Sequence, residues 1–173
     1  KHSVGVVVVL PVGQATGPGQ VEGGSTRSES VRRGLAAVPS DATIVCVHDA
    51  ARPFASPVIF QRVISAVVDG ADAAVPGVAV VDTIKQVNES EVVVATPRRE
   101  TLRAVQTPQA FRASSLRRAH EQGGEGTDDA ALIERIGGEV VVVEGEIVNR
   151  KITSPEDLEW AVAHANRLLA GEI

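Results

Sequence analysis

The sequence predicts an open α/β sheet, mostly parallel, with helices on both faces and a projecting β-arm hairpin. Three observations support this fold class. The apolar residues are mainly β-branched or small, with 30 Val and 23 Ala against one Trp, three Phe and no Tyr or Met. Short apolar runs alternate with segments that carry helix-start signals, as in βα units. One segment near the middle replaces this alternation with the pattern of a β-hairpin.

The first part of the chain predicts two strands and a helix. The Val-rich run 3–11 is continuous and ends at a proline, which is typical of a central parallel strand. Residues 20–22 predict a short strand after a loop rich in Gly and Pro. Either Ser25 or Thr26 is a suitable N-cap for a helix that extends to about Val38, where a proline follows.

A second strand and helix follow. The apolar run 43–47 predicts a buried strand, and we expect the lone Cys46 within it to be a buried thiol rather than a nucleophile. Ser56 followed by Pro57 places an N-cap residue before a proline at the first helical position. We therefore expect a helix from this point to Val68.

The middle of the chain departs from the alternation of strands and helices. Residues 73–76 and 78–81 predict two short strands. Residues 83–87 and 91–95 then alternate apolar and polar side chains on either side of the polar turn 88–90. Because a hairpin with one polar face is unsuited to the centre of a sheet, we interpret it as an arm that projects from the sheet.

The C-terminal part predicts three helices and two strands. Thr127 is the expected N-cap of a helix to Ile136, and the two acids after it suit the positive end of the helix dipole without a bound metal. Ser154 and Pro155 repeat the helix-start signal for the last helix. The other expected elements are a helix over 112–121, a buried strand over 139–143 and a short strand over 149–153.

Composition excludes several classes of function. The 173 residues suit one domain with a substantial core. A net charge of −5 and a pI near 5.4 disfavour binding to nucleic acid or to an anionic membrane, and the few aromatic residues disfavour base stacking. No apolar stretch approaches the ~20 residues of a membrane span. We expect a cytoplasmic protein with no nucleic-acid or membrane partner.

Several polar motifs follow predicted strands, where ligands of open α/β sheets bind. Gly23 and Gly24 precede a helix start and suit an anion, although they also fit an ordinary β-to-α turn. Asp49 and Arg52 suit phosphate or metal binding, or else they pair with each other to hold their loop. Lys151 is one of three lysines and lies either on the surface or against a phosphate as a point charge.

Six motifs, in this order, resemble a known family. They are Gly23-Gly24 with Arg27, Ser30-Val31 and Gly34-Leu35; His48-Asp49-Ala50-Ala51-Arg52-Pro53; Asp82-Thr83-Ile84-Lys85; Thr107-Pro108-Gln109-Ala110-Phe111; Thr127-Asp128-Asp129-Ala130; and Lys151-Ile152-Thr153 with Pro155-Glu156-Asp157-Leu158. The second and fourth are the most specific. From residue 3 to the last helix, the sequence is similar to the 2-C-methyl-D-erythritol 4-phosphate cytidylyltransferases of non-mevalonate isoprenoid biosynthesis.

The resemblance implies a Rossmann-like nucleotidyltransferase sheet and a set of nucleotide contacts. Gly23, Gly24 and Ser30 would lie against the cytosine and ribose of CTP. Asp49 and Ala50 would contact CTP and the incoming phosphosugar alcohol. The resemblance also implies Mg²⁺, bound mainly through the nucleotide phosphates and water rather than by residues of the protein.

Further roles implied by the resemblance concern the acceptor and the reaction. Arg52 would lie near the two substrates, and Thr107 would hydrogen-bond the acceptor. Thr83 and Arg99 match arm residues that reach across a homodimer to bind 2-C-methyl-D-erythritol 4-phosphate, whereas the sequence around Arg99 taken alone indicates a solvated turn. Lys151 matches the lysine that stabilises the transition state, so Lys151 and Arg99 are the expected catalytic residues.

Family members begin with a strand and a Gly-rich loop of the form P-A-A-G-x-G-x-R, and this sequence contains no such segment. We therefore expect residues 1–173 to be one nucleotidyltransferase domain that is N-terminally incomplete, with 82–97 as its dimerisation arm. Two other interpretations stay open. One is a ribitol-5-phosphate cytidylyltransferase, which differs in the acceptor. The other is a non-catalytic α/β dimerisation remnant, against which the joint presence of the expected site residues argues.

Overall fold

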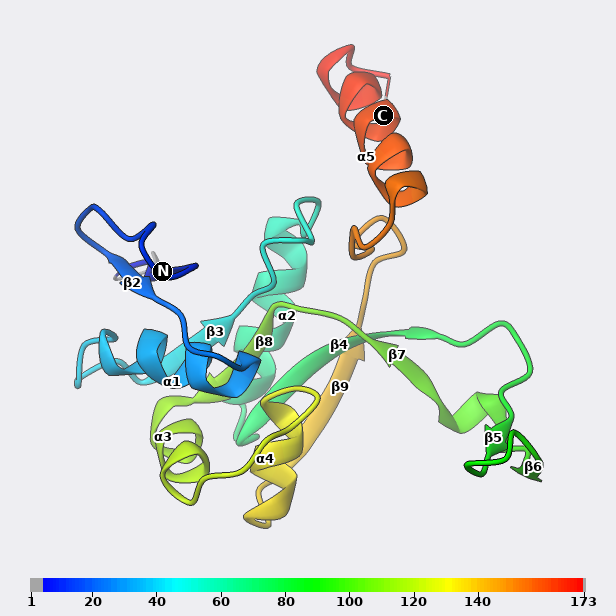
Figure 1. Ribbon diagram of the computed structural model, residues 1–173, viewed down its shortest axis with the longest axis horizontal. Helices are drawn as coiled ribbons and strands as arrows, with labels where there is room; N and C mark the ends of the chain where they lie inside the picture. Colours follow the sequence, from blue (N-terminus) through cyan, green and yellow to red (C-terminus); the bar gives the residue numbers. More distant parts are fainter. Residues whose placement is uncertain (1–4, 173) are drawn as a thin grey trace.

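The computed structural model describes residues 5–172 and places a five-stranded sheet between helices (Figure 1). The strands are β1 (Val8–Leu10), β2 (Gln20–Glu22), β3 (Ile44–Val47), β4 (Ala73–Ala79), β5 (Gln86–Val87), β6 (Val93–Ala95), β7 (Arg103–Val105), β8 (Gln109–Arg112) and β9 (Val140–Glu144). The helices are α1 (Arg27–Ala36), α2 (Pro57–Val68), α3 (Ala113–Glu121), α4 (Ala130–Arg135) and α5 (Pro155–Leu169), with a short 3₁₀ turn at Arg99–Thr101.

The central sheet has the order β3-β8-β4-β7, with β9 also paired to β4. Strands β3, β4 and β9 run in one direction, because β9 is parallel to β4 and both β3 and β4 are antiparallel to β8. Strand β7 is antiparallel to the second half of β4. The α/β class is confirmed, and the sheet is mixed, since the segment 103–112 returns through its centre against the other three strands.

The core lies on both faces of this sheet. On one face, α1, α3 and α4 pack against β4 and β8 through buried Leu35, Phe111, Leu116 and Ile133. On the other face, α2 packs through Val63 and Val67. Helices on both faces were expected, and Ala on the strands permits their close approach because alanine adds little bulk to the sheet surface.

Strands β1 and β2 form a separate parallel pair. The expected central position of the run 3–11 is wrong for its described part, because β1 pairs with β2 alone and Val8 and Val9 are 45% and 37% exposed. Residues 3 and 4 of that run lie outside the described residues. Helix α1 covers the pair closely, since a Cβ at Gly34 would come within 2.8 Å of Val9.

Side-chain caps begin three of the helices as expected. Thr26 accepts the amide of Glu29, Ser56 accepts the amide of Ile59, and Ser154 forms a reciprocal capping box with Asp157. The expected Thr127 cap is wrong. Helix α4 begins at Ala130 with Asp129 at the N-cap position, and the Asp129 side chain makes no capping bond. The side chain of Asp128 instead accepts the amide of Ala131 at 3.0 Å.

Other differences concern the strands. One strand, β4, replaces the two expected over 73–76 and 78–81. Residues 149–153 form no strand and are loop instead. Strands β7 and β8 were not expected. The hairpin is confirmed: β5 pairs with β6 around a turn in which the Asn88 side chain accepts the amides of Ser90 and Val92. It projects from the sheet at the right of Figure 1.

No helix among residues 5–172 is long and apolar enough to cross a membrane.

Candidate functional site

The loops that follow β3 and β9 bring a lysine and a carboxylate together. Lys151 Nζ lies 2.9 Å from Asp49 Oδ2, and their side chains are 46% and 22% exposed. The amide of Asp49 donates to the hydroxyl of buried Thr107 at 3.0 Å, and the amide of Ile152 donates to the carbonyl of Ala51 at 2.8 Å. Ala50 lies in the same loop as Asp49 and is exposed. Residues from three separate parts of the chain therefore meet at one edge of the sheet.

His48 determines what the Thr107 hydroxyl can offer a ligand. Partial burial lowers the pKa of His48, so the ring is neutral at pH 7. Its Nε2 lies 3.1 Å from the carbonyl of Arg52, which can only accept, so Nε2 carries the proton and Nδ1 accepts from Thr107 at 3.1 Å. The Thr107 hydroxyl thus uses its own proton within the protein and has one lone pair left for a donor on a ligand.

Arg52 connects the loop after β3 to the loop after β9. Its Nη1 donates to the carbonyl of Asn149 at 2.8 Å, and burial lowers its pKa. The guanidinium is therefore turned toward the loop after β9, while its amide donates to the carbonyl of Asp49 at 2.9 Å. The alternative interpretation, a direct Asp49–Arg52 ion pair, is not observed in the described part of the chain, where Lys151 is the partner of Asp49.

The loop before α1 is held by side chains of that helix. Ser30 Oγ accepts the amide of Gly24 at 3.0 Å and donates to the carbonyl of Thr26 at 2.9 Å. Glu29 accepts both the amide and the hydroxyl of Ser25, and these bonds lower the pKa of Glu29 to about 2. A Cβ at Gly24 would overlap Glu29, so glycine is needed there to let the side chain cross the loop.

Arg33 completes this loop by donating to the carbonyl of Gly23 at 2.8 Å. A Cβ at Gly23 would lie 2.9 Å from the Ser30 hydroxyl. Among residues 5–172, no hydrogen bond or ion pair joins the Gly23–Gly24 loop to Asp49 or Lys151.

Thr83 lies in the arm and Arg99 lies just after it, and neither is placed with the other expected site residues. Both are exposed, and Arg99 Nη1 donates to the carbonyl of Val81 at 2.8 Å at the base of the arm. Neither residue contacts Asp49, Thr107 or Lys151 within the described part of the chain. One chain thus gathers Asp49, Arg52, Thr107 and Lys151, and leaves Thr83 and Arg99 apart from them.

Sequence reasoning missed a polar group bonded to the site loops. It comprises buried Gln106 and Asn149 with partly buried Glu146. Gln106 Nε2 donates to the carbonyl of Glu146 at 2.8 Å, and its Oε1 accepts the Glu146 amide at 3.1 Å. Only their positions in the sequence could have indicated these residues, because each lies within a few residues of Thr107 or Lys151.

Asp129 is the centre of a second buried polar cluster. Its carboxylate contacts Arg27 at 2.8 Å and His120 at 3.0 Å. Burial raises the pKa of Asp129, but the bonds from His120 and Arg27 outweigh it and hold the pKa below its ordinary value. Cys46 is partly buried, and burial raises the pKa of its thiol to about 11, so it is not poised as a nucleophile.

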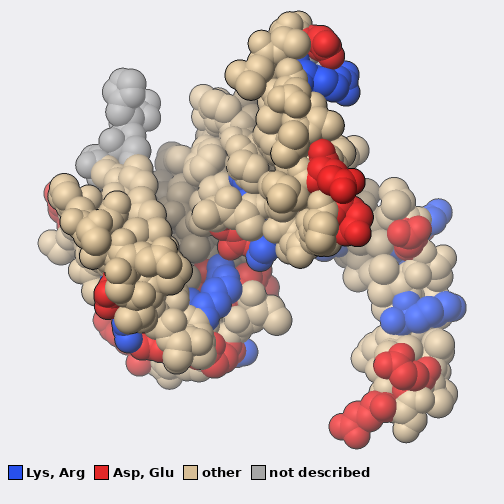
Figure 2. Space-filling model, turned by 45° about the horizontal axis from the view of Figure 1, so that its top comes forward, with Lys and Arg blue, Asp and Glu red and all other residues tan. Residues whose placement is uncertain are grey.

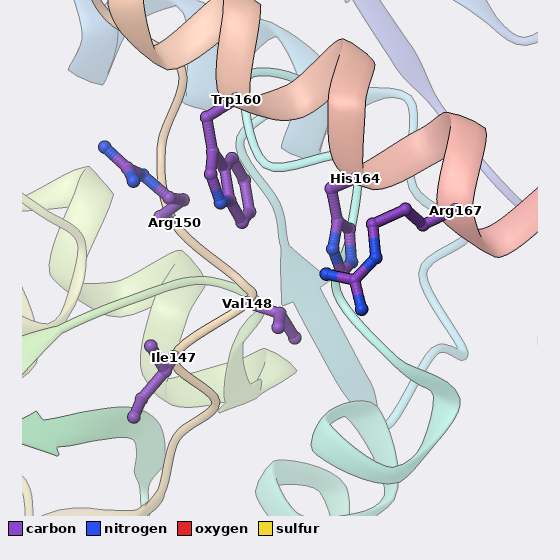
Figure 3. A pocket seen from close by; sticks show the side chains of 6 residues that line it. All are labelled: Ile147, Val148, Arg150, Trp160, His164 and Arg167. Carbon is purple, nitrogen blue, oxygen red and sulfur yellow. The ribbon is translucent and has the colours of Figure 1, made fainter. Parts of the chain in front are cut away.

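A pocket of about 430 Å³ lies between α5 and the segment before it (Figure 3). The rings of Trp160 and His164 stack along α5, and the guanidinium of Arg150 lies 4.7 Å from the centre of the Trp160 ring. Arg150 also pairs with Asp157, and Arg167 pairs with Glu172. None of the expected site residues lines this pocket. In Figure 2, basic and acidic side chains lie side by side at the recess in the visible face.

The fold and its loops define a class: an α/β protein with helices on both faces of its sheet and a charged site at the strand ends, as in nucleotide-handling enzymes. The family model for 2-C-methyl-D-erythritol 4-phosphate cytidylyltransferase, IspD, matches residues 13–167. The chain belongs to this family.

Known proteins agree with this assignment. A 2-C-methyl-D-erythritol 4-phosphate cytidylyltransferase from Streptomyces avermitilis is 50% identical over 150 residues, which are 83% of this chain and 60% of the relative. The bifunctional enzyme IspD/IspF of Nitratidesulfovibrio vulgaris strain DP4 is 52% identical over 142 residues, which are 80% of this chain and 36% of the relative. This chain thus spans less than two thirds of either relative.

A solved structure shares the fold. The 2-C-methyl-D-erythritol 4-phosphate cytidylyltransferase of Thermus thermophilus matches with a TM-score of 0.82 and 42% sequence identity, covering 94% of this chain and 82% of that one.

Proposed function

We propose that this chain carries the cytidylyl-transfer site of an enzyme that joins CTP and 2-C-methyl-D-erythritol 4-phosphate. The products are 4-diphosphocytidyl-2-C-methyl-D-erythritol and pyrophosphate. The observation that carries the proposal is the Lys151–Asp49 pair beside Thr107 at the strand ends, in a chain that matches the family over residues 13–167. The names of the relatives support the choice of nucleotide and acceptor.

In this reaction an oxygen of the acceptor's phosphate attacks the α-phosphorus of CTP. A P–O bond forms there while the bond from the α-phosphorus to the oxygen of pyrophosphate breaks, and pyrophosphate leaves in line. Little proton transfer is required, so positioning and positive charge supply the rate. The half-exposed ammonium of Lys151 supplies a compact positive charge. When the substrates bind, this ammonium leaves Asp49 and contacts phosphate oxygens instead.

The other site residues bind and orient the substrates. Thr107 accepts a hydrogen bond from a hydroxyl of the sugar alcohol, since its own proton is directed to His48. Gly23 and Gly24 lie against the cytidine, and Ser30 acts by holding their loop through its two hydrogen bonds. Asp49 and Ala50 lie between the substrates, and Arg52 supports their loop from behind.

We propose that Mg²⁺ binds mainly through the nucleotide phosphates and water. The chemistry of the donors fits this arrangement, because Asp49, the carboxylate of the site, already faces the ammonium of Lys151. When bound, the metal neutralises phosphate charge.

We further propose that the arm, 82–97, forms a homodimer and thereby places Thr83 and Arg99 against the acceptor in the partner's site. The support is physical: an isolated two-stranded hairpin is marginally stable in water, and Val92, Val93 and Val94 on this arm are 58%, 52% and 56% exposed. Sedimentation at micromolar concentration should give a dimer, and a monomer with the arm intact would contradict this part of the proposal. We place the enzyme in the cytoplasm, where CTP is available.

We would measure the activity of the native protein purified from its own cells. Release of pyrophosphate from CTP should require Mg²⁺ and 2-C-methyl-D-erythritol 4-phosphate, and Asp49→Asn should abolish most of it. Asp41→Asn, which changes an exposed carboxylate before β3, is the matched control and should leave the rate unchanged. A preference for ribitol 5-phosphate as acceptor, or no release with either acceptor, would refute the proposed function.

A further inference from the structure

Asn149 lies where three segments of the site meet. The residue is fully buried, with 0% of its surface exposed. Its side-chain Nδ2 donates to the carbonyl of Thr107 at 2.8 Å, and its backbone carbonyl accepts from Arg52 Nη1 at 2.8 Å. Its backbone amide donates to the carbonyl of Glu146 at 3.0 Å, which closes the turn after β9. One residue is therefore bonded to all three loops of the site.

These bonds connect the residues that carry the charge and the hydrogen bonds of the site. Thr107 accepts the amide of Asp49, and Arg52 belongs to the same loop as Asp49. Lys151 follows Asn149 by two residues. The position of the lysine backbone relative to Asp49 and Thr107 thus depends on the bonds that Asn149 makes.

The amide group is specific to this place. The buried carbonyl of Thr107 needs a donor, and an unpaired buried carbonyl is costly. Asn149 Nδ2 supplies that donor and also lies 3.4 Å from Gln106 Oε1. A carboxylate of the same shape offers only acceptors, so it would face both oxygens without a proton to share.

We propose that Asn149 is a positioning residue for cytidylyl transfer, holding the loop of Lys151 in register with Asp49 and Thr107. This inference rests on the proposed function. Asn149 touches no reacting atom in this scheme and acts through the placement of the lysine. Since a displacement of about 1 Å can cost about 10²-fold in rate, loss of its side chain should lower kcat.

The kinetic test compares Asn149→Ala and Asn149→Asp with a matched control. Both variants should lower kcat by about 10²-fold and change the KM for CTP by less than about threefold. The control is Ser115→Ala, which removes another buried hydrogen bond, from Ser115 Oγ to Asp72 at 2.6 Å, far along the sheet from Lys151. It should leave kcat unchanged, so a general loss of stability is separated from misplacement of the lysine.

A second measurement does not depend on activity. The sequence holds three lysines, so a ¹⁵N spectrum of the lysine side chains is simple, and Lys151→Met identifies the Lys151 signal. That signal should shift in Asn149→Asp and stay in place in Ser115→Ala. An unmoved signal, or an Asn149→Asp enzyme with the wild-type kcat, would overturn the inference.

Folding and function are distinguished by the same set of proteins. If both Asn149 variants fail to fold while Ser115→Ala folds, Asn149 is structural and the positioning role is wrong. If the unaltered protein transfers no cytidylyl group, the proposed function fails, and the Lys151 signal still reports whether Asn149 places the lysine.

Discussion

Replacing Lys151 by alanine should remove most of the activity and little of the stability. The ammonium lies 2.9 Å from Asp49, but the two side chains are 46% and 22% exposed, so water and salt screen the pair. Ion pairs of this kind contribute about 0–1 kcal/mol to folding. We therefore expect the free energy of unfolding of Lys151→Ala to lie within about 1 kcal/mol of the unaltered protein.

The effect on the reaction should be larger, because the lysine meets charge that develops on the α-phosphate. Loss of a donor to such charge costs about 10²–10³-fold in kcat, or about 2.7–4 kcal/mol in the barrier. The values of kcat and kcat/KM should fall together, since the interaction is made in the transition state. Lys151→Arg should restore little, because a planar guanidinium does not replace a compact ammonium.

The assay pairs steady-state release of pyrophosphate with urea unfolding of the same samples. Arg62→Ala, which removes an exposed ion pair with Glu144 at 3.5 Å, controls for the loss of a surface charge. A Lys151→Ala enzyme that keeps kcat and only raises KM would refute the reasoning, because the lysine would then bind substrate and transition state equally. A loss of several kcal/mol in stability would refute the treatment of the pair as screened.

Arg99→Ala should raise the KM for the phosphorylated acceptor and leave the KM for CTP unchanged. The control Arg98→Ala, at the exposed neighbouring arginine, should change neither KM. A lower kcat with an unchanged KM for the acceptor would contradict a contact between Arg99 and the acceptor. If Arg99 acts across a dimer, mixing inactive Arg99→Ala and Lys151→Ala subunits should restore activity, and exchange without recovery would exclude a shared site. Asp128→Ala should lower the free energy of unfolding, measured in urea, by about 1 kcal/mol, because Asp128 accepts the amide of Ala131. Thr127→Ala should leave it unchanged. A larger loss in Thr127→Ala than in Asp128→Ala would show that Thr127 is the cap after all. Because partial burial lowers the pKa of His48 from 6.5, the unfolded chain binds a proton first as the pH falls. Neutral His48 therefore contributes fully to the free energy of unfolding above pH 6.5, and this contribution is lost as the pH falls below that value. The free energy of unfolding of His48→Asn, measured in urea, should depend less on pH than that of the unaltered protein between about pH 7.5 and about pH 5.5. Identical pH dependence in the two proteins would contradict the pKa shift.

Local signals allowed the helices to be predicted well. Ser56 with Pro57 and Ser154 with Pro155 mark helix starts because the capping hydroxyl and the fixed proline act within one turn of chain. The Thr127 prediction failed for a related reason. Several residues suited to capping stand side by side there. Asp129 takes the N-cap position, and Asp128 accepts the amide of Ala131 while Gln109 of β8 donates to its other oxygen. A contact from a distant strand thus accompanies a choice that local sequence leaves open.

The strands show the opposite limit. Strands β7 and β8 carry polar residues and are interrupted by Pro108, which lacks an amide proton, so their pattern is weak. They form because β4 pairs with both strands and β3 pairs with β8 along its length, a condition set by separate segments of the chain. For the same reason the valines of β1 did not predict its burial correctly. Hydrophobic side chains favour a buried position, but β1 pairs with β2 alone and its valines stay partly exposed.

By itself the sequence determined the α/β class, the helix starts and the residue types of the site, because caps, apolar runs and charged loops are local properties of the chain. Only the tertiary structure decided that Lys151 pairs with Asp49, that Thr107 directs its proton to His48, and that Asn149 ties their loops together. These contacts join residues 42 or more positions apart, and they depend on side-chain geometry at the sheet edge, which periodicity and composition do not encode.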